Sequence, residues 1–534
     1  MNRKYLAELL RRAAPAGMPA SQRRRAVLRI ATALAASAVL APLTPRKTWA
    51  QPRFSAYPFT LGVASGSPRA DGAVLWTRLA PEPLADGGMP QGNVALGWEL
   101  AADEGFRNIV RTGTATATPE HGHSVHVELA DLEPARWYWY RFTAGDAVSA
   151  VGRTRTAAAP DAALEHLRFG FASCQQYEQG YYAAHRHLAA EDLDLVVFLG
   201  DYIYETSWGR NHVRKHATAE PYTLADYRTR HAQYKTDPDL QRSHAAAPWI
   251  VTWDDHEVDN DYADDRSEDL DPDFLARRAA AYQAYYEHMP LARRALPRGP
   301  HAQIYDRFTF GDLVQFHVLD DRQYRTHQAC ARPGRGGSNV VADCAERLAP
   351  ERTMLGAAQE AWLSDGLART RARWNVIAQQ TLMARHARTS AYGQSFWTDG
   401  WDGYPAARAR LINDIARLKP SNPLVIGGDV HCNWVADLKP DFDDTNSPVV
   451  ATEFCGTSIT SQGPSAKQLL AWLAENPHLR YGNGTKRGYV KMEIGRNGCT
   501  ATLRALESEK RADSGIYTLA TFVVESGRPG AQRA

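Results

Sequence analysis

The pattern of hydrophobic and polar positions in this 534-residue chain changes near residue 157. Before that point, short runs of apolar and polar residues are separated by turn residues, which is typical of antiparallel strands. We expect strands at 73–78, 94–100, 124–129 and 137–142. The sequence therefore predicts a small all-β sandwich domain at 51–157.

After an Ala- and Pro-containing linker at 154–163, apolar strands alternate with helical stretches. This alternation predicts a layered α/β domain at 158–534. Strands are expected at 167–172, 193–199, 249–253, 313–319, 374–378 and 424–426, each followed directly by polar residues. Because α/β domains build their sites on the loops after the carboxyl ends of strands, we expect the functional residues there.

Aromatic residues alternate in the segment 137–142, behind a Leu-x-Pro corner at 132–134. Fibronectin-III-like domains have a comparable tyrosine corner, and the resemblance supports a sandwich. We interpret these aromatics as core or sheet-face packing, with carbohydrate binding as the alternative.

Composition and charge narrow the function classes. The chain is 44% hydrophobic and 10% aromatic, so it can form a substantial core and is not intrinsically disordered. Its formal net charge is +2, but residues 1–50 carry ten Lys or Arg and one Glu, which leaves the rest at about −7. A nucleic-acid-binding module would show a basic excess, so none is expected.

The first 50 residues carry an export signal. Arg23, Arg24 and Arg25 precede an apolar run at 30–43, and Thr48-Trp49-Ala50 is a small-x-small cleavage pattern. This arrangement indicates a twin-arginine signal peptide at 1–50, used by proteins that fold before export. An amphipathic surface helix or a membrane anchor is the alternative, but the run is shorter than the ~20 residues of a spanning helix. We expect export by the twin-arginine machinery to the periplasm or the exterior, and no transmembrane segment.

Six cysteines remain after the signal. Cys330 and Cys344 flank a polar, Gly-rich loop, and in an oxidising compartment we interpret them as a local disulfide. Cys432, Cys455 and Cys499 are better explained as buried small hydrophobic residues.

Acidic and imidazole side chains gather after the predicted strands. Asp201 and Tyr204 form an Asp-x-x-Tyr turn, and a carboxylate beside a phenolate suits ferric iron. Asp429 and His431 are two residues apart at another strand end. A third strand leads into Asp254-Asp255-His256-Glu257, where clustered carboxylates need cations. Each motif alone could be a capped turn or an acidic loop, but together they predict a dinuclear metal site.

These motifs resemble those of the alkaline phosphatase D family of metallophosphatases. Its pattern is matched in order by Phe59 to Gly66, Val74 to Arg78, Phe171 to Gln175, Gly200 to Glu205, Thr252 to Glu257, Trp401 to Pro405 and Gly428 to His431. The resemblance covers essentially the whole chain after the signal. It implies a calcineurin-like, four-layer α/β/β/α metallophosphatase core preceded by the small β-sandwich, together with an Fe³⁺ and Ca²⁺ centre.

The resemblance also implies roles for individual residues. Asp201 would bridge the two metals, Cys174, Tyr204 and His431 would lie on the iron side, and Asp255, Asp429 and the Asn260 amide would face the second metal. Carboxylate and carbonyl oxygens suit calcium, whereas a thiolate among hard ligands is unusual, so a buried structural Cys174 is the alternative. Either Asp254 or Asp255 could be the ligand on that loop.

With such a centre, a metal-bound hydroxide would attack phosphorus, and His256 would protonate the leaving oxygen or only fix its loop by hydrogen bonding. Arg322 and Arg408 are candidates to hold phosphate oxygens. Three aromatic residues could line the pocket or belong to the core, namely Trp397, Trp401 and Tyr404.

The sequence therefore predicts a secreted, metal-dependent phosphoesterase that hydrolyses phosphate monoesters, diesters or both, and that is a monomer. The alternatives are a phosphodiesterase or phospholipase-type hydrolase using the same site, and a catalytically silent protein that binds the cell envelope. Pocket walls rather than ligands would decide between substrates.

Overall fold

The computed structural model describes residues 54–534 apart from 391–392. The predicted export signal at 1–50 lies outside the described residues. Within the described part, no helix has the length and apolar character needed to cross a membrane.

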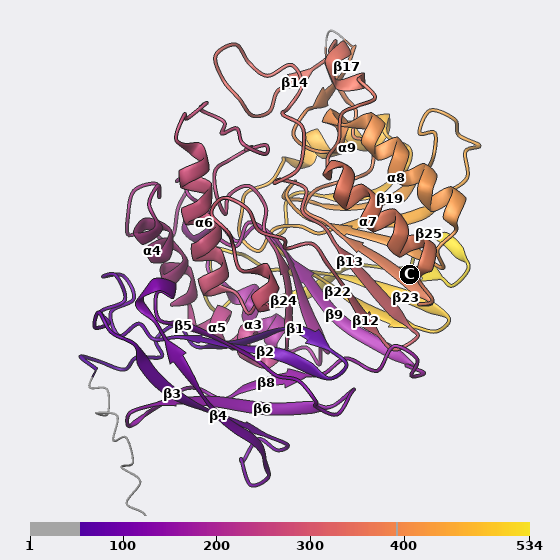
Figure 1. Ribbon diagram of the computed structural model, residues 1–534. Coiled ribbons are helices and arrows are strands. Elements are labelled where there is room, and N and C mark those ends of the chain that lie inside the picture. Colours follow the sequence, from indigo (N-terminus) through magenta and orange to yellow (C-terminus); the bar gives the residue numbers. More distant parts are fainter. Residues whose placement is uncertain (1–53, 391–392) are drawn as a thin grey trace, which may run out of the picture. The chain divides into compact units, whose positions relative to one another are not determined.

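Two large sheets form the centre of the molecule (Figure 1). The first has ten strands, and its middle strands β9, β10 and β11 are parallel. Its order is β25 (Arg528–Arg533), β24 (Ile516–Glu525), β23 (Gly498–Leu506), β22 (Gly488–Gly495), β9 (His166–Ala172), β10 (Leu195–Leu199), β11 (Trp249–Thr252), β1 (Val63–Arg69), β2 (Gly72–Arg78) and β5 (Ser124–Glu128).

The second sheet has seven strands, with β13, β15, β18 and β20 parallel to one another. Its order is β12 (Asp306–Phe310), β13 (Val314–Val318), β15 (Trp374–Ala378), β18 (Pro423–Gly427), β20 (Ala451–Cys455), β19 (Asn433–Leu438) and β21 (Leu479–Asn483). Near-continuous apolar runs such as that of β10 are buried on both faces, as expected for parallel strands between layers.

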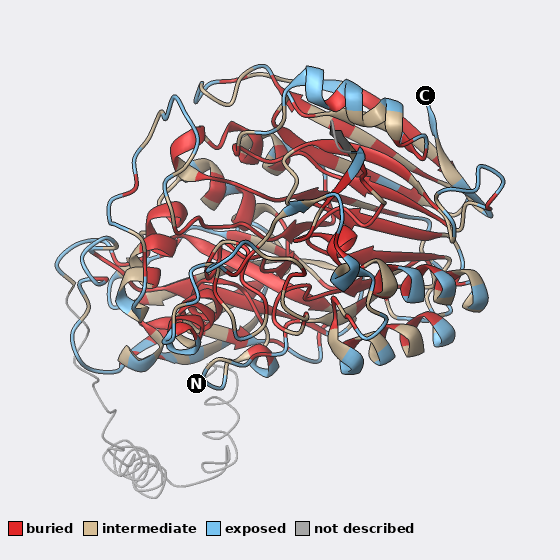
Figure 2. Cartoon of the chain, turned by 90° about the horizontal axis from the view of Figure 1, so that it is seen from above, coloured by how far each residue is buried: buried red, intermediate tan, exposed pale blue. Residues whose placement is uncertain are grey.

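The two sheets share one hydrophobic core, in which Phe169 of the first sheet meets Phe316 of the second edge to face at 5.1 Å. Helices cover both outer sides. The first sheet packs with α3 (Ala183–Ala190), α4 (Leu224–Lys235), α5 (Pro238–Ala246) and α6 (Phe274–His288), and the second with α7 (Gly356–Arg369), α8 (Pro405–Leu418) and α9 (Ala466–Glu475). Figure 2 shows buried strands between helices that expose their outer faces. This is the predicted four-layer α/β/β/α core.

The N-terminal β-sandwich is also present. A five-stranded sheet is formed by β4 (Ile109–Ala117), β3 (Val94–Ala101), β6 (Trp137–Ala144), β7 (Ala147–Val148) and β8 (Gly152–Arg155). Its core residues Leu100 and Tyr140 join one cluster with Leu75 of β2. The aromatics Tyr138, Tyr140 and Phe142 are buried, which fits the packing interpretation. Strand β1 pairs in parallel with β11, so this region continues into the first large sheet.

Smaller elements complete the described chain. A three-stranded sheet joins β14 (Val340–Val341), β17 (Gly393–Trp397) and β16 (Arg388–Ser390). Single 3-10 turns occur at Pro119–His121, Tyr177–Gln179, Arg293–Ala295, Ala345–Leu348 and Trp401–Gly403. Cys330 and Cys344 form a disulfide, as the sequence predicted, and the other four cysteines are free and buried.

Candidate metal centre

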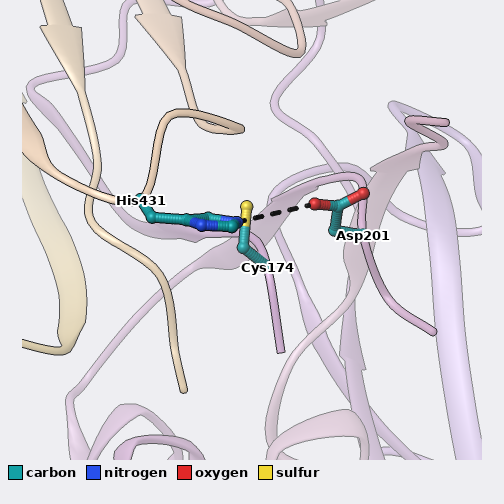
Figure 3. A group of neighbouring side chains, drawn as sticks. All are labelled: Cys174, Asp201 and His431. Atoms are coloured by element: carbon teal, nitrogen blue, oxygen red, sulfur yellow. Dashed lines mark ion pairs between the residues drawn. The ribbon is translucent and has the colours of Figure 1, made fainter. Parts of the chain in front are cut away.

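The ends of three strands from the two sheets meet at one place. Cys174 follows β9, Asp201 follows β10, and His431 lies four residues after β18. One ligand atom from each of these three side chains lies within 4.8 Å of the other two (Figure 3). Three β-strands thus present a thiol, a carboxylate and an imidazole to a common point, although they are up to 257 residues apart in the chain.

The backbone at these strand ends adopts an uncommon conformation. Cys174, Asp201, Asp429 and His431 all have a positive φ, at 59°, 54°, 63° and 54° respectively. Non-glycine residues rarely occupy this left-handed region, and such residues concentrate at functional sites. Gly200 is required for a related reason, since its φ is 96° and a Cβ there would lie 2.5 Å from the Cβ of Asp254.

Tyr204 lies within the same group. Its hydroxyl donates to Asp201 Oδ2 at 2.7 Å, accepts from Ser461 Oγ at 2.8 Å and lies 3.2 Å from His431 Nε2. Burial raises the pKa of the Tyr204 phenol well above its ordinary value, and Asp201 raises it further. The pKa of the Cys174 thiol is raised by the same two causes. Both groups are therefore neutral in the chain alone.

His431 is held with one ring nitrogen directed toward the group. Its Nδ1–H donates to the Gln462 carbonyl at 2.9 Å, which leaves Nε2 at 4.0 Å from Asp201 Oδ2. Trp208 stacks on the imidazole with the ring centroids 5.5 Å apart. Burial lowers the pKa of His431 to about 3, so the ring is the neutral imidazole that can bind a metal.

A second group adjoins the first. Asp201, Asp255 and His256 also offer ligand atoms within 4.8 Å of one another. Burial raises the pKa of Asp201 and of Asp429 well above the ordinary range. Asp201 Oδ1 and Asp429 Oδ2 are buried and have no hydrogen-bond partner among the described residues. Buried carboxylate oxygens in that state are costly unless a cation or proton satisfies them.

The loop after β11 separates its two neighbouring acids. Asp255 lines the pocket into which these strand ends open. Asp254 does not line that pocket and accepts a hydrogen bond from Arg322 Nε. Burial raises the pKa of Asp255, but Arg322 and His256 together hold it below its usual value. Asn260 also lines the pocket, with its Nδ2 donating to Glu268 Oε2 at 2.8 Å.

Sequence reasoning missed two carboxylates that organise these loops. Glu205 Oε2 accepts from His256 Nδ1 at 2.7 Å, which fixes the imidazole and leaves its Nε2 free. Glu257 accepts from the backbone N–H groups of Asp201 at 3.0 Å and Asp254 at 2.6 Å, and so joins two loops. Glu205 ends the motif Gly200 to Glu205, and Glu257 ends the motif Thr252 to Glu257. Their position next to the candidate ligands in the sequence was the signal that could have identified them.

The two arginines considered as phosphate ligands have other partners. Arg322 is 1% exposed and contacts four carboxylates, those of Asp254, Asp399 (2.5 Å), Asp255 (3.6 Å) and Asp429 (3.9 Å). Arg408 pairs with Asp402 at 2.6 Å and does not line this pocket. The structure thus places Arg322 beneath the acidic cluster and Arg408 outside it, because both guanidinium groups are held by buried carboxylates.

The strand ends open into a pocket of about 550 Å³. Nine carboxylate residues line it, together with His256, His431 and Asn260 on the acidic side. Of the three aromatic residues considered in the sequence, Trp397 lines this pocket, while Trp401 and Tyr404 are buried in the core around α8.

Comparison with known proteins bears on the family of this chain. The family profile described as PhoD-like phosphatase matches residues 169–503, and the profile of the PhoD-like phosphatase N-terminal domain matches 44–158. Alkaline phosphatase D of Bacillus subtilis (strain 168) is 48% identical over 497 residues, which cover 91% of this chain and 84% of that protein.

A solved structure described as that of PhoD superposes with a TM-score of 0.86 at 48% identity. The match covers 90% of this chain and 93% of the solved one. Fold, strand-end motifs and overall identity lead to the same conclusion: this chain is a phosphoric ester hydrolase and belongs to the PhoD-like phosphatase family.

Proposed function

We propose that this chain hydrolyses phosphate monoesters, diesters or both at a dinuclear centre of Fe³⁺ and Ca²⁺. The iron would be held by Cys174, Tyr204 and His431. The calcium would be held by Asp255, Asp429 and Asn260, and Asp201 would contact both cations. The observation that carries the proposal is the convergence of nine carboxylate residues on one pocket. A phosphate ester is itself an anion, so it would be repelled from this pocket unless cations were present.

The residues fit such a centre. One oxygen each of Asp201 and Asp429 has no hydrogen-bond donor among the described residues, and the ligand atoms of Cys174, Asp201 and His431 lie within 4.8 Å of one another. Thiolate, phenolate and imidazole suit iron, whereas carboxylate and amide oxygens suit calcium. Because the Cys174 thiol and the Tyr204 phenol are neutral without metal, we expect loading to release protons and to weaken as the pH falls.

When bound, the two cations would activate the attacking water and neutralise charge on the phosphoryl oxygens. The chain's own contribution includes the proton for the leaving oxygen. Burial lowers the pKa of His256, but the carboxylates of Glu205 and Asp201 raise it well above its ordinary value. In this proposal Glu205 orients the ring through Nδ1, and the Nε2–H of His256 would donate the proton to the leaving oxygen.

Arg322 has a different part in this proposal from that of a phosphate ligand. Its guanidinium lies 3.6 Å from Asp255 and 3.9 Å from Asp429, which would both face the calcium. A permanent positive charge at that place partly offsets the repulsion between the two carboxylates before metal binds. We therefore treat Arg322 as a positioning residue and Arg408 as a structural one.

Export by the twin-arginine route supports the metal assignment and belongs to the same proposal. That route carries folded proteins, so metals can be loaded before the chain leaves the cytoplasm. The product would act in the periplasm or outside the cell. Hydrolysis of lipid head groups by the same centre is the second candidate, and only substrate comparison separates the two.

The test pairs Asp201→Asn with Asp131→Asn, because Asp131 is an exposed aspartate with the same φ of 54°. We expect Asp201→Asn to lose metal and to lower kcat/KM for 4-nitrophenyl phosphate by about 100-fold or more. The Asp131→Asn variant should match the unmodified chain. Elemental analysis of the exported protein should find iron and calcium, and Tyr204→Phe should remove the visible absorption of an iron–phenolate pair.

Two results would overturn this proposal. The first is a folded Asp201→Asn protein with full metal content and full activity. The second is an active exported protein that contains zinc or manganese alone, which would refute the assignment of iron and calcium.

A further inference from the structure

The pocket has a second side, opposite in chemistry to the acidic one. It is lined by His386, Arg388, Trp397 and Trp472, and we refer to these four residues as the aromatic wall. Arg388 is the one arginine among the lining residues, and no lysine lines the pocket within the described chain. The function proposed above uses none of these side chains.

Separate elements build the aromatic wall. Arg388 begins β16, Trp397 ends β17 and Trp472 lies in α9. Strand β17 and helix α9 lie toward the top of Figure 1, and β16 pairs with β17 and contacts α9. The Arg388 guanidinium lies 5.1 Å from the Trp472 ring centroid and 5.8 Å from that of Trp397. His386 meets Trp472 edge to face at 4.8 Å. These contacts hold the side chains in fixed positions around the pocket.

Two polar atoms of the aromatic wall lack partners. Arg388 Nε and His386 Nε2 are buried atoms without a hydrogen bond to any described residue. Buried polar groups are nearly always hydrogen-bonded, so such pairs of unpaired atoms at one pocket call for a ligand or ordered water. Burial lowers the pKa of His386 to about 3, so its ring is neutral, and Arg388 supplies the positive charge.

Packing alone would not explain these residues. A core tryptophan is closed off from solvent, as Trp401 is, whereas Trp397 and Trp472 each remain only partly buried. Half-open indole faces beside a cavity are the surfaces on which planar rings stack. A stacking surface next to a cation recognises a ring that carries an acceptor or a negative charge.

We propose that the aromatic wall binds the organic group of the substrate, and that preferred substrates are phosphate esters whose organic group is a planar ring bearing a hydrogen-bond acceptor or an anionic substituent. The ring stacks on Trp472 and Trp397, and the substituent meets Arg388. The proposal rests on the proposed function, because the phosphate of the same molecule must reach the acidic side.

The test is calorimetric titration of the metal-loaded protein with three phosphonates that cannot be hydrolysed. They are methylphosphonate, benzylphosphonate and 4-carboxybenzylphosphonate, which add first a ring and then a charge. We expect each addition to tighten binding by about tenfold. Because calorimetry needs no turnover, it measures the contribution of the aromatic wall to binding affinity separately from catalysis.

Variants assign the two gains. Trp472→Leu should remove the gain from the ring, and Arg388→Met should remove the gain from the carboxylate while the ring gain stays. Leu470→Ala is the matched control, since Leu470 lies on the same helix and is 67% exposed. If Trp472→Leu fails to fold, Trp397→Leu carries the same prediction.

Turnover then identifies the source of the ring. We expect thymidine 5′-monophosphate or 4-carboxybenzyl phosphate, whose leaving groups are alcohols like that of methyl phosphate, to exceed methyl phosphate in kcat/KM by about tenfold or more. The better of the two shows whether the ring is a nucleobase or a benzyl group. Equal affinity for all three phosphonates in a protein that hydrolyses methyl phosphate would overturn this inference and leave the proposed function standing.

Discussion

Replacement of Arg322 by methionine tests whether the buried arginine balances the acidic cluster or binds substrate. The guanidinium is 1% exposed, and its Nε and Nη1 bond to Asp254 and Asp399. Asp399 would keep the Arg325 guanidinium at 2.7 Å, but the second oxygen of Asp254 has no partner among the described residues. The variant therefore leaves Asp254 as a buried carboxylate without a counter-charge.

The expected cost follows from this geometry. A unit charge 3.6 Å away at an effective dielectric constant of 20 interacts by about 4–5 kcal/mol, which describes the Asp255 contact. Removal of one partner from a buried ion pair lowers stability by about 3–5 kcal/mol, because the other charge stays desolvated. We expect Arg322→Met to lower the free energy of unfolding by that amount, a large share of the ~5–15 kcal/mol of a native protein.

Urea unfolding of the purified variant, followed by tryptophan fluorescence, gives this free energy. Arg417→Met is the control, since Arg417 is 63% exposed in its pair with Asp414 on α8 and should cost less than about 1 kcal/mol. KM for 4-nitrophenyl phosphate is measured alongside. An Arg322→Met protein of unchanged stability, with KM raised about 100-fold, would refute this reasoning and restore Arg322 as a phosphate ligand.

Three further predictions concern the scaffold. Glu257→Gln should lower the free energy of unfolding, measured in urea, by about 2–4 kcal/mol. The Glu257 carboxylate accepts hydrogen bonds from backbone N–H groups, whereas the glutamine N–H₂ would face those donors and could not accept from them. An unchanged midpoint of urea unfolding would contradict this prediction. The Cys330→Ser, Cys344→Ser double variant should lose about 3 kcal/mol, as a closed loop of this length predicts, and reductant should then have no further effect on thermal unfolding. Burial lowers the pKa of His185 to about 3, so its stabilising contribution is complete above pH ~6.5 and decreases as the pH falls toward 3. His185→Phe should reduce the slope of stability against pH between 6.5 and 4 by about 1.4 kcal/mol per unit, and an unchanged slope would show that His185 takes up no proton.

The sequence predicted the fold well because its signals are local. The strands expected at 193–199 and 249–253 are found as β10 (Leu195–Leu199) and β11 (Trp249–Thr252). Continuous apolar runs that end at Gly-Asp or Asp-Asp mark buried strands and the loops behind them. The two-sheet arrangement came from the family resemblance rather than from periodicity, because nothing within a single strand says which sheet it joins.

The candidate ligands were accessible to sequence reasoning for the same local reason. Asp201 and His431 stand two and four residues beyond a strand, and the parallel strands of a layered domain bring such positions to one edge. The assignment of Cys174, two residues beyond β9, came from the family resemblance. Their positive φ angles could not be predicted, since aspartate, histidine and cysteine adopt that conformation only when the surrounding structure imposes it.

The partners of charged residues depend instead on tertiary contacts. The sequence therefore could not predict that Arg322 and Arg408 pair with buried carboxylates. Asp399 is 77 residues from Arg322 in the chain, and its approach is set by the loop before α8 rather than by any motif. An arginine after a strand has the same sequence pattern whether it contacts a substrate or a buried aspartate. The distinction matters for function, because a cluster that assembles four carboxylates around the Arg322 guanidinium has its charges only partly balanced, and two of the four, Asp255 and Asp429, face the pocket. The chain itself supplies part of the counter-charge for the nine lining carboxylate residues, because Arg322 lies near Asp255 and Asp429, and Arg277 and Arg335 each pair with two of the others. Cations at the proposed centre would supply the rest.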